Sequence, residues 1–168
     1  MMFAFHDGRD TSSLPEMIDE YEHVAQPRHP DGKILLDYWQ HCVDQHGDFV
    51  VGRDIPSRMI ARLLSSVVVS EPVDGGANYR IRLAGTSVRR RFGDEIGGRM
   101  LSDMFSPEDF AHHLADTNLV LQTGKPLVVD SRLRRGVVEE LHSEVVLLPV
   151  KSPDGTQHWS LVGVFYFE

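Results

Sequence analysis

The sequence predicts one α+β domain built around an antiparallel sheet, and three features of its 168 residues support this prediction. Apolar residues recur with the period of an α-helix over residues 33–45. Further along, two strand-like runs flank a Gly-rich turn at residues 74–76, which is typical of a hairpin. The last segment, 157–167, is apolar on both faces, as expected for a central strand that is covered on both sides.

The beginning of the chain is expected to lie outside this domain, which would span residues 32–168 as a single unit. Pro15 suits the first turn of a helix, and the apolar residues after it form a narrow stripe as far as Val24. A Pro-rich break comes next. Residues 1–31 are therefore predicted to form an N-terminal arm that is partly disordered or holds one short helix.

The first strong helix is predicted over Lys33–Gln45, because its apolar residues share one face and Gly47 follows as a stop signal. This helix either covers one face of its own sheet or pairs with the same helix of a second copy, and the sequence leaves both possibilities open. The residues that would form this cap or dimer seam are Ile34, Leu35, Tyr38, Trp39 and Val43.

A hairpin is expected in the middle of the chain. A short helix from Pro56 leads into a first strand at 66–73, which is rich in β-branched residues. The second strand, 79–83, alternates apolar residues with arginines. Short helical pieces are then predicted over 86–105, where glycines interrupt the pattern.

A clear helix start follows at Ser106, whose hydroxyl can cap the N–H group three residues on. Pro107 fits the first turn, Asp109 can reach back, and the helix should end near Gly124. Turn signals then separate three closing strands, at about 126–134, 137–150 and 157–167.

Charge and cysteine content narrow the classes of function. The formal net charge is -8, from 25 acidic and 17 basic side chains, so a duplex nucleic acid is not an expected partner. No apolar run reaches the length of a membrane span, and no membrane partner is expected. The single cysteine, Cys42, cannot form an internal disulfide. These features favour a cytoplasmic location.

The segment 80–101 contains an ordered set of residues: Arg82, Leu83, Ala84, Gly85, Thr86, Phe92, Gly93, Glu95, Gly98 and Leu101. This set resembles the second strand, the following helix and the Gly-rich turn of a bacterial PAS domain subfamily. The upstream run Leu36-Asp37-Tyr38-Trp39 is similar to that subfamily's leading helix, and the resemblance covers roughly residues 33–167.

This resemblance implies a five-stranded antiparallel sheet in the order 2-1-5-4-3, with helices on one face and an N-terminal helix capping the other. PAS domains hold a small ligand between sheet and helices, or pair through an N-terminal helix, and signal to kinase, cyclase or transcription modules. No output module is recognisable after the last strand. The chain is therefore expected to be a stand-alone module that acts on another chain.

A ligand pocket of this kind should be apolar, with few polar anchors. The competing interpretation is that the same residues fill the core at normal packing density. The pocket candidates are Tyr79, Leu83, Phe92, Phe105, Phe110, His113, Leu114 and Trp159.

No cofactor is expected to be obligatory. Some PAS domains bind haem through a histidine of the long helix, and here His113, near the inward face, fits that role better than His112. Flavin photochemistry is disfavoured because Cys42 lies on an apolar helix face and lacks the required motif. No other metal site is expected. No nucleophile elbow or phosphate-binding loop is present, so catalytic residues are not expected either.

The leading hypothesis is a sensory module that binds a small ligand, a partner protein in trans, or both. An alternative from a different class is a structural module with a filled core that forms a homodimer. A haem-based sensor is a weaker alternative. A second copy of the chain, a signalling protein and a small molecule are the expected partners.

Overall fold

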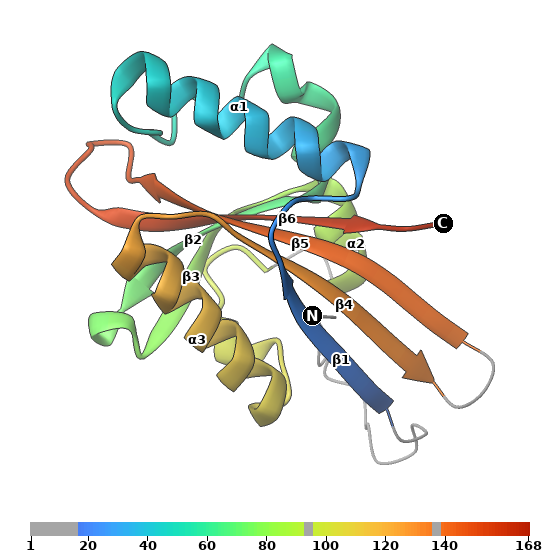
Figure 1. Ribbon diagram of the computed structural model, residues 1–168. Helices are drawn as coiled ribbons and strands as arrows, with labels where there is room; N and C mark the ends of the chain where they lie inside the picture. Colours follow the sequence, from blue (N-terminus) through green and yellow to red (C-terminus); the bar gives the residue numbers. More distant parts are fainter. Residues whose placement is uncertain (1–16, 93–95, 136–138) are drawn as a thin grey trace.

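The described part of the chain, residues 17–92, 96–135 and 139–168, forms a six-stranded antiparallel sheet with helices on both faces (Figure 1). This computed structural model gives the strand order β1-β4-β5-β6-β2-β3. The long β6 strand therefore lies inside the sheet, as its two apolar faces require. The strands are β1 Met17–Val24, β2 Val67–Val73, β3 Asn78–Ala84, β4 Leu127–Arg135, β5 Glu139–Lys151 and β6 His158–Tyr166.

The prediction of a short helix in the arm 1–31 is wrong for residues 17–24, which form strand β1. This strand pairs with β4 over its whole length, from Met17 opposite Arg135 to Val24 opposite Val128. An isolated helix of this length is marginal in water, whereas the strand gains a full ladder of hydrogen bonds. The five-stranded prediction is therefore also wrong, because β1 adds a sixth strand.

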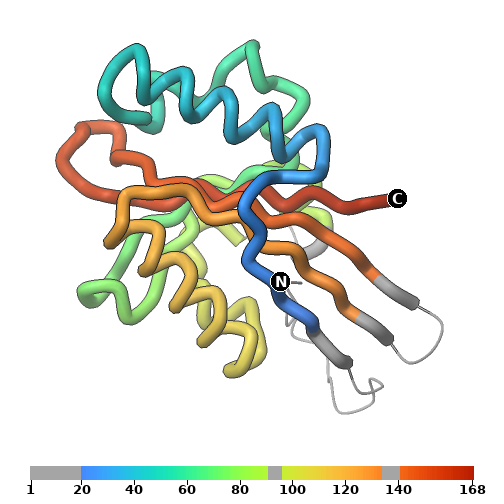
Figure 2. The backbone as a smooth tube through the Cα atoms, in the orientation of Figure 1, coloured from blue at the N-terminus to red at the C-terminus, as the bar shows by residue number. Residues whose placement is uncertain are grey.

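One face of the sheet is covered by α1, Pro30–His46, together with the short helix η2, Arg58–Ser66 (Figure 1). The chain reaches α1 through β1, so the first element is not a helix (Figure 2). The prediction of an N-terminal helix as the cap is wrong in this respect, since α1 follows a strand and shares the face with η2.

Helix α1 lies close to the sheet because β6 carries a glycine beneath it. A Cβ atom on Gly163 would lie 2.6 Å from Leu35 Cδ2 and 2.8 Å from the Phe165 ring. On the same face, Trp39 Nε1 donates a hydrogen bond to the Pro149 carbonyl at 2.9 Å. These contacts tie α1 to the two central strands β5 and β6.

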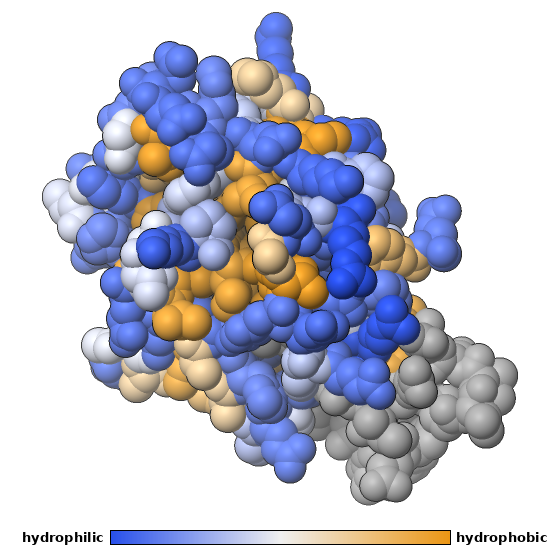
Figure 3. Space-filling model, in the orientation of Figure 1, coloured by the Kyte–Doolittle hydropathy of each residue, from blue (hydrophilic) through white to orange (hydrophobic). Residues whose placement is uncertain are grey.

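The opposite face is covered by α3, Pro107–Thr123, with α2, Thr86–Phe92, and η4, Leu101–Asp103. Helix α3 begins as predicted, since Ser106 Oγ accepts a hydrogen bond from Asp109 N, and it ends at Gly124 with φ 67°. The Asp109 carboxylate accepts a hydrogen bond from the Tyr21 hydroxyl, so β1 is tied to α3. Apolar side chains show at the surface between the α1 layer and the α3 layer (Figure 3).

Candidate functional site

A cavity of about 720 Å³ opens beside the face of the sheet that α3 covers. Pockets of roughly 300–1,000 Å³ are typical of small-molecule sites. Its exposed lining residues, Pro30, Arg62, Ser87 and Glu168, mark the mouth. Its buried lining residues mark the interior: Ser70, Ile81, Val88, Met104, Phe105, His113, Thr117, Leu147, Ser160 and Phe165.

Two serines form the polar centre of the cavity wall. Ser70 and Ser160 are Cα partners on the neighbouring strands β2 and β6, and both side chains are buried. Their hydroxyl oxygens lie 2.7 Å apart, so one hydroxyl donates a hydrogen bond to the other. The apolar Val68 and Val162, also Cα partners, line the cavity beside them.

His113 projects from α3 into this cavity, whereas His112 faces outward, as predicted from their positions on the helix. The His113 side chain is 2% exposed, and its ring centroid lies 4.2 Å from that of Phe105. Burial lowers the pKa of His113 well below its usual range. The His113 imidazole is therefore neutral at physiological pH. His112, on the outer side of the helix, contacts the Tyr21 ring.

The mouth of the cavity joins the start of α1 to the end of β6. His29 Nδ1 accepts a hydrogen bond from Asp31 N, which caps α1, and its Nε2 lies 3.1 Å from the Tyr166 carbonyl oxygen. The buried Glu144 carboxylate of β5 accepts the N–H groups of Arg28 and His29. The two strands β5 and β6 and the start of α1 are thus connected at this point.

The comparisons with known proteins agree with this geometry. A family of PAS domains matches residues 27–166. The chain belongs to the PAS domain family. No match was found among curated proteins. The match begins just before α1 and ends with β6, so strand β1 lies ahead of the matched region of this PAS domain.

Of the pocket residues predicted from the sequence, Phe105 and His113 line the cavity of the PAS domain. Phe110 and Leu114 are half-buried and do not line it. Tyr79 is buried beside it and donates a hydrogen bond to Asn118, while burial raises the pKa of Tyr79 to about 12. The side chain of Phe92 lies outside the described residues.

The prediction is wrong for Leu83, which is 50% exposed and does not line the cavity. The pairing of β2 with β3 shifts its register between Val69 and Ser70, so Ile81 lies opposite Ser70 and Leu83 opposite Val69. A shift by one residue reverses the face to which a strand side chain points. Leu83 is therefore on the α1 side of the sheet.

The prediction is also wrong for Trp159, which packs in the core beneath α1. Successive side chains of a strand point to opposite faces. On β6, Ser160, Val162 and Val164 line the cavity, whereas Trp159 and Leu161 point the other way.

Sequence reasoning missed Ser70, Ser160 and Thr117 as lining residues. A sequence signal exists for the serines, because each is a small polar residue within an apolar strand. Their pairing depends on which strands are neighbours in the sheet, and neither serine indicates this by itself.

Most of the residues proposed as a cap or dimer seam lie on the side of α1 that faces the sheet. Leu35, Tyr38 and Trp39 are buried in the core beneath α1, and Val43 packs against its edge. Ile34 lies on the outer side of the helix and is 39% exposed. The first three side chains are therefore not available to a second copy while the domain remains folded.

Cys42 is buried in the same core, and burial raises the pKa of its thiol. This agrees with the expectation of a structural rather than a reactive cysteine. Within the described residues, no group of three or more His, Cys, Asp or Glu side chains is placed to hold a metal ion. No described helix is long and apolar enough to cross a membrane.

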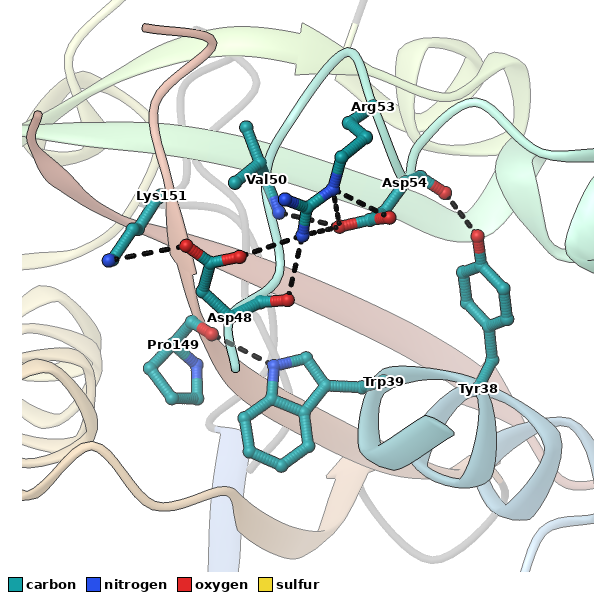
Figure 4. Close-up of polar contacts among 8 residues, drawn as sticks. All are labelled: Tyr38, Trp39, Asp48, Val50, Arg53, Asp54, Pro149 and Lys151. Carbon is teal, nitrogen blue, oxygen red and sulfur yellow. Dashed lines mark hydrogen bonds and ion pairs between the residues drawn. The ribbon is translucent and has the colours of Figure 1, made fainter. Parts of the chain in front are cut away.

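A second polar cluster holds the loop after α1 against β5 (Figure 4). The Arg53 guanidinium forms ion pairs with Asp48 and Asp54 at 2.7 and 2.8 Å, and Lys151 contacts Asp48 at 3.3 Å. Burial pushes the pKa of Asp54 upward, but hydrogen bonds from Arg53 and Val50 N outweigh it and lower the pKa. None of these residues lines the cavity, and their contacts serve to hold the loop after α1 in place.

Proposed function

We propose that this PAS domain is a sensory module that binds a small molecule in its cavity and signals to a partner protein. The observation that supports this proposal most directly is the cavity of about 720 Å³, which has a buried serine pair and His113 on its walls. A pocket of this size, with apolar walls and a few polar groups, is typical of small-molecule binding sites. The proposed role is binding rather than catalysis.

The mouth offers a route for the signal. Val164, Phe165 and Tyr166 of β6 line the cavity, and Tyr166 is joined through its carbonyl oxygen to His29 at the start of α1. A ligand that displaces the end of β6 would therefore also displace the start of α1. A partner protein that contacts either segment could detect the change.

The proposal is tested with two Val→Phe changes inside the cavity. Val68 and Val162 are cross-strand partners on the cavity wall, so Val68→Phe/Val162→Phe, the plugged variant, places two rings across it. We expect wild type to bind the uncharged fluorophore Nile red and the plugged variant to bind it at least about tenfold more weakly. Circular dichroism should first show that the plugged variant has the helix and strand content of wild type.

The matched control is Leu119→Phe/Leu141→Phe, which adds the same rings at exposed positions away from the cavity. It should bind Nile red like wild type. Equal binding by the plugged variant would show that the dye, and by extension a ligand, uses another surface.

The filled-core homodimer remains the second candidate, and it requires a seam other than Leu35, Tyr38 and Trp39, which are buried. The haem alternative is supported by the position of His113 on the cavity wall. The mouth fits haem poorly, because the propionate carboxylates of haem would lie near the carboxylates of Asp31 and Glu168. Arg62 already pairs with Asp31 at 2.8 Å.

A further inference from the structure

We infer that the cavity selects an uncharged, largely apolar molecule that carries a hydrogen-bond acceptor, such as an ester or ketone carbonyl. This inference rests on the proposed function, since it assigns a chemical class to the ligand of the same cavity. Three observations carry it: the charges along the lining, the ionisation state of His113, and the hydrogen bonds of the serine pair.

The interior of the cavity provides no counter-ion for a charged ligand. Of the described lining residues, the acidic and basic ones are Asp31, Arg62 and Glu168, and none of them is buried. His113 is buried and neutral because burial lowers its pKa. An unpaired charge transferred into such surroundings loses its hydration without compensation, so an ionised group is excluded from the interior.

The mouth also disfavours an anionic headgroup. Arg62 is ion-paired with Asp31, whose carboxylate oxygen lies 2.8 Å from its guanidinium. Glu168 adds a second carboxylate to the rim. His29 accepts a hydrogen bond at Nδ1 from Asp31 N, which requires that nitrogen to be unprotonated. An acid entering here would meet two carboxylates and a guanidinium that is already paired.

The serine pair supplies a donor that a ligand can use. Two hydroxyl groups carry two protons, and the bond between Ser70 and Ser160 uses one of them. The described contacts give the second proton no acceptor, and the pair lies on the cavity wall. A buried hydroxyl proton without an acceptor is costly, so a carbonyl oxygen in the cavity would be stabilised there.

The selectivity is tested with two isomers that differ in charge. Methyl nonanoate and decanoic acid have the same atomic composition, but at about pH 7 the acid is ionised and the ester is not. We expect wild type to bind the ester at least about tenfold more tightly, measured by displacement of Nile red and by native mass spectrometry. The plugged variant should bind neither isomer.

The outcomes separate this inference from the proposed function. If wild type binds decanoate as tightly as the ester and the plugged variant binds neither, the inference is overturned and the proposed function stands. If the ester does not bind wild type while Nile red still distinguishes wild type from the plugged variant, the inference alone is overturned. If the ester and Nile red both bind equally to wild type and the plugged variant, both are overturned.

The donor is tested by Ser70→Ala/Ser160→Ala, which removes both hydroxyls from the wall. Loss of one hydrogen bond should lower the affinity for the ester roughly threefold to tenfold. The control Ser87→Ala changes an exposed serine at the mouth and should bind the ester like wild type. Unchanged affinity in the double variant would show that the pair does not bind the acceptor.

Discussion

At the scale of single residues, the close approach of α1 to the sheet depends on one missing side chain. Gly163 is the position on β6 where any Cβ would press against Leu35 and the Phe165 ring. We expect Gly163→Ala to lower the free energy of unfolding by about 1–3 kcal/mol, because overpacking forces neighbouring side chains from their preferred positions. Urea denaturation measures this difference.

Gly97 provides the matched control, since a Cβ there meets no atom within 4 Å. Gly97→Ala should leave the urea midpoint nearly unchanged. If both substitutions had the same effect, the packing of Leu35 on Gly163 would not be a determinant of stability.

Side chains near the cavity show what a sequence reveals at this scale and what it does not. The inward position of His113 was predictable, because the face of a helix on which a residue lies follows from its spacing along the sequence. The face of Leu83 was not, because a register shift opposite Val69 moves it across the sheet. Ser70 and Ser160 were missed because they become a pair only when β2 and β6 lie side by side.

At the scale of elements, α1 is a cover for its own sheet. Trp39 is 6% exposed and hydrogen-bonded to Pro149, so Trp39→Glu would place a carboxylate in the core. We expect this change to cost about 4 kcal/mol or more and to unfold the domain rather than dissociate a dimer. Circular dichroism and sedimentation together distinguish these results.

His41→Glu serves as the control because His41 lies on the exposed side of the same helix. It should leave fold and oligomeric state unchanged. A folded monomeric Trp39→Glu variant of a dimeric wild type would instead show that this helix forms an intersubunit contact.

The loop between α1 and η2 gives the domain a dependence on pH. The folded-state pKa of Asp54 is lowered, so its contribution to stability is present above the ordinary aspartate pKa of about 4 and is lost as the pH falls through the lowered value. We expect the urea midpoint of wild type to drop between pH 5 and 2, and Asp54→Asn to lose part of that dependence.

Asp37→Asn, at an exposed position of α1, is the control and should follow the wild-type profile. An Asp54→Asn variant with the full acid dependence of wild type would show that other carboxylates cause it.

Strand β1 is an element that the sequence pattern alone could not predict. Its apolar residues Met17, Ile18, Tyr21 and Val24 are spaced as on a helix face, but the strand is stabilised by β4, more than a hundred residues away in the sequence. Helix α3, by contrast, was predictable because Ser106 and Gly124 specify its ends locally.

At the scale of the whole molecule, the cavity of the PAS domain opens beside the α3 face of the sheet and extends to the start of α1, while Leu35 and Trp39 pack in the core beneath α1. The strand that lines the cavity, β6, is also the strand on which α1 rests. Under the proposed function, a ligand in the cavity would act on α1 through β6, and this is the coupling that a sensor requires.

The most direct test of ligand binding is a native mass spectrum of freshly purified wild type, recorded beside the plugged variant and again after incubation with methyl nonanoate. The account predicts an excess mass on wild type that is absent from the plugged variant. The size of that excess distinguishes haem from a smaller metabolite. Wild type that shows the mass of the bare chain in every sample, as monomer or dimer, would contradict the account.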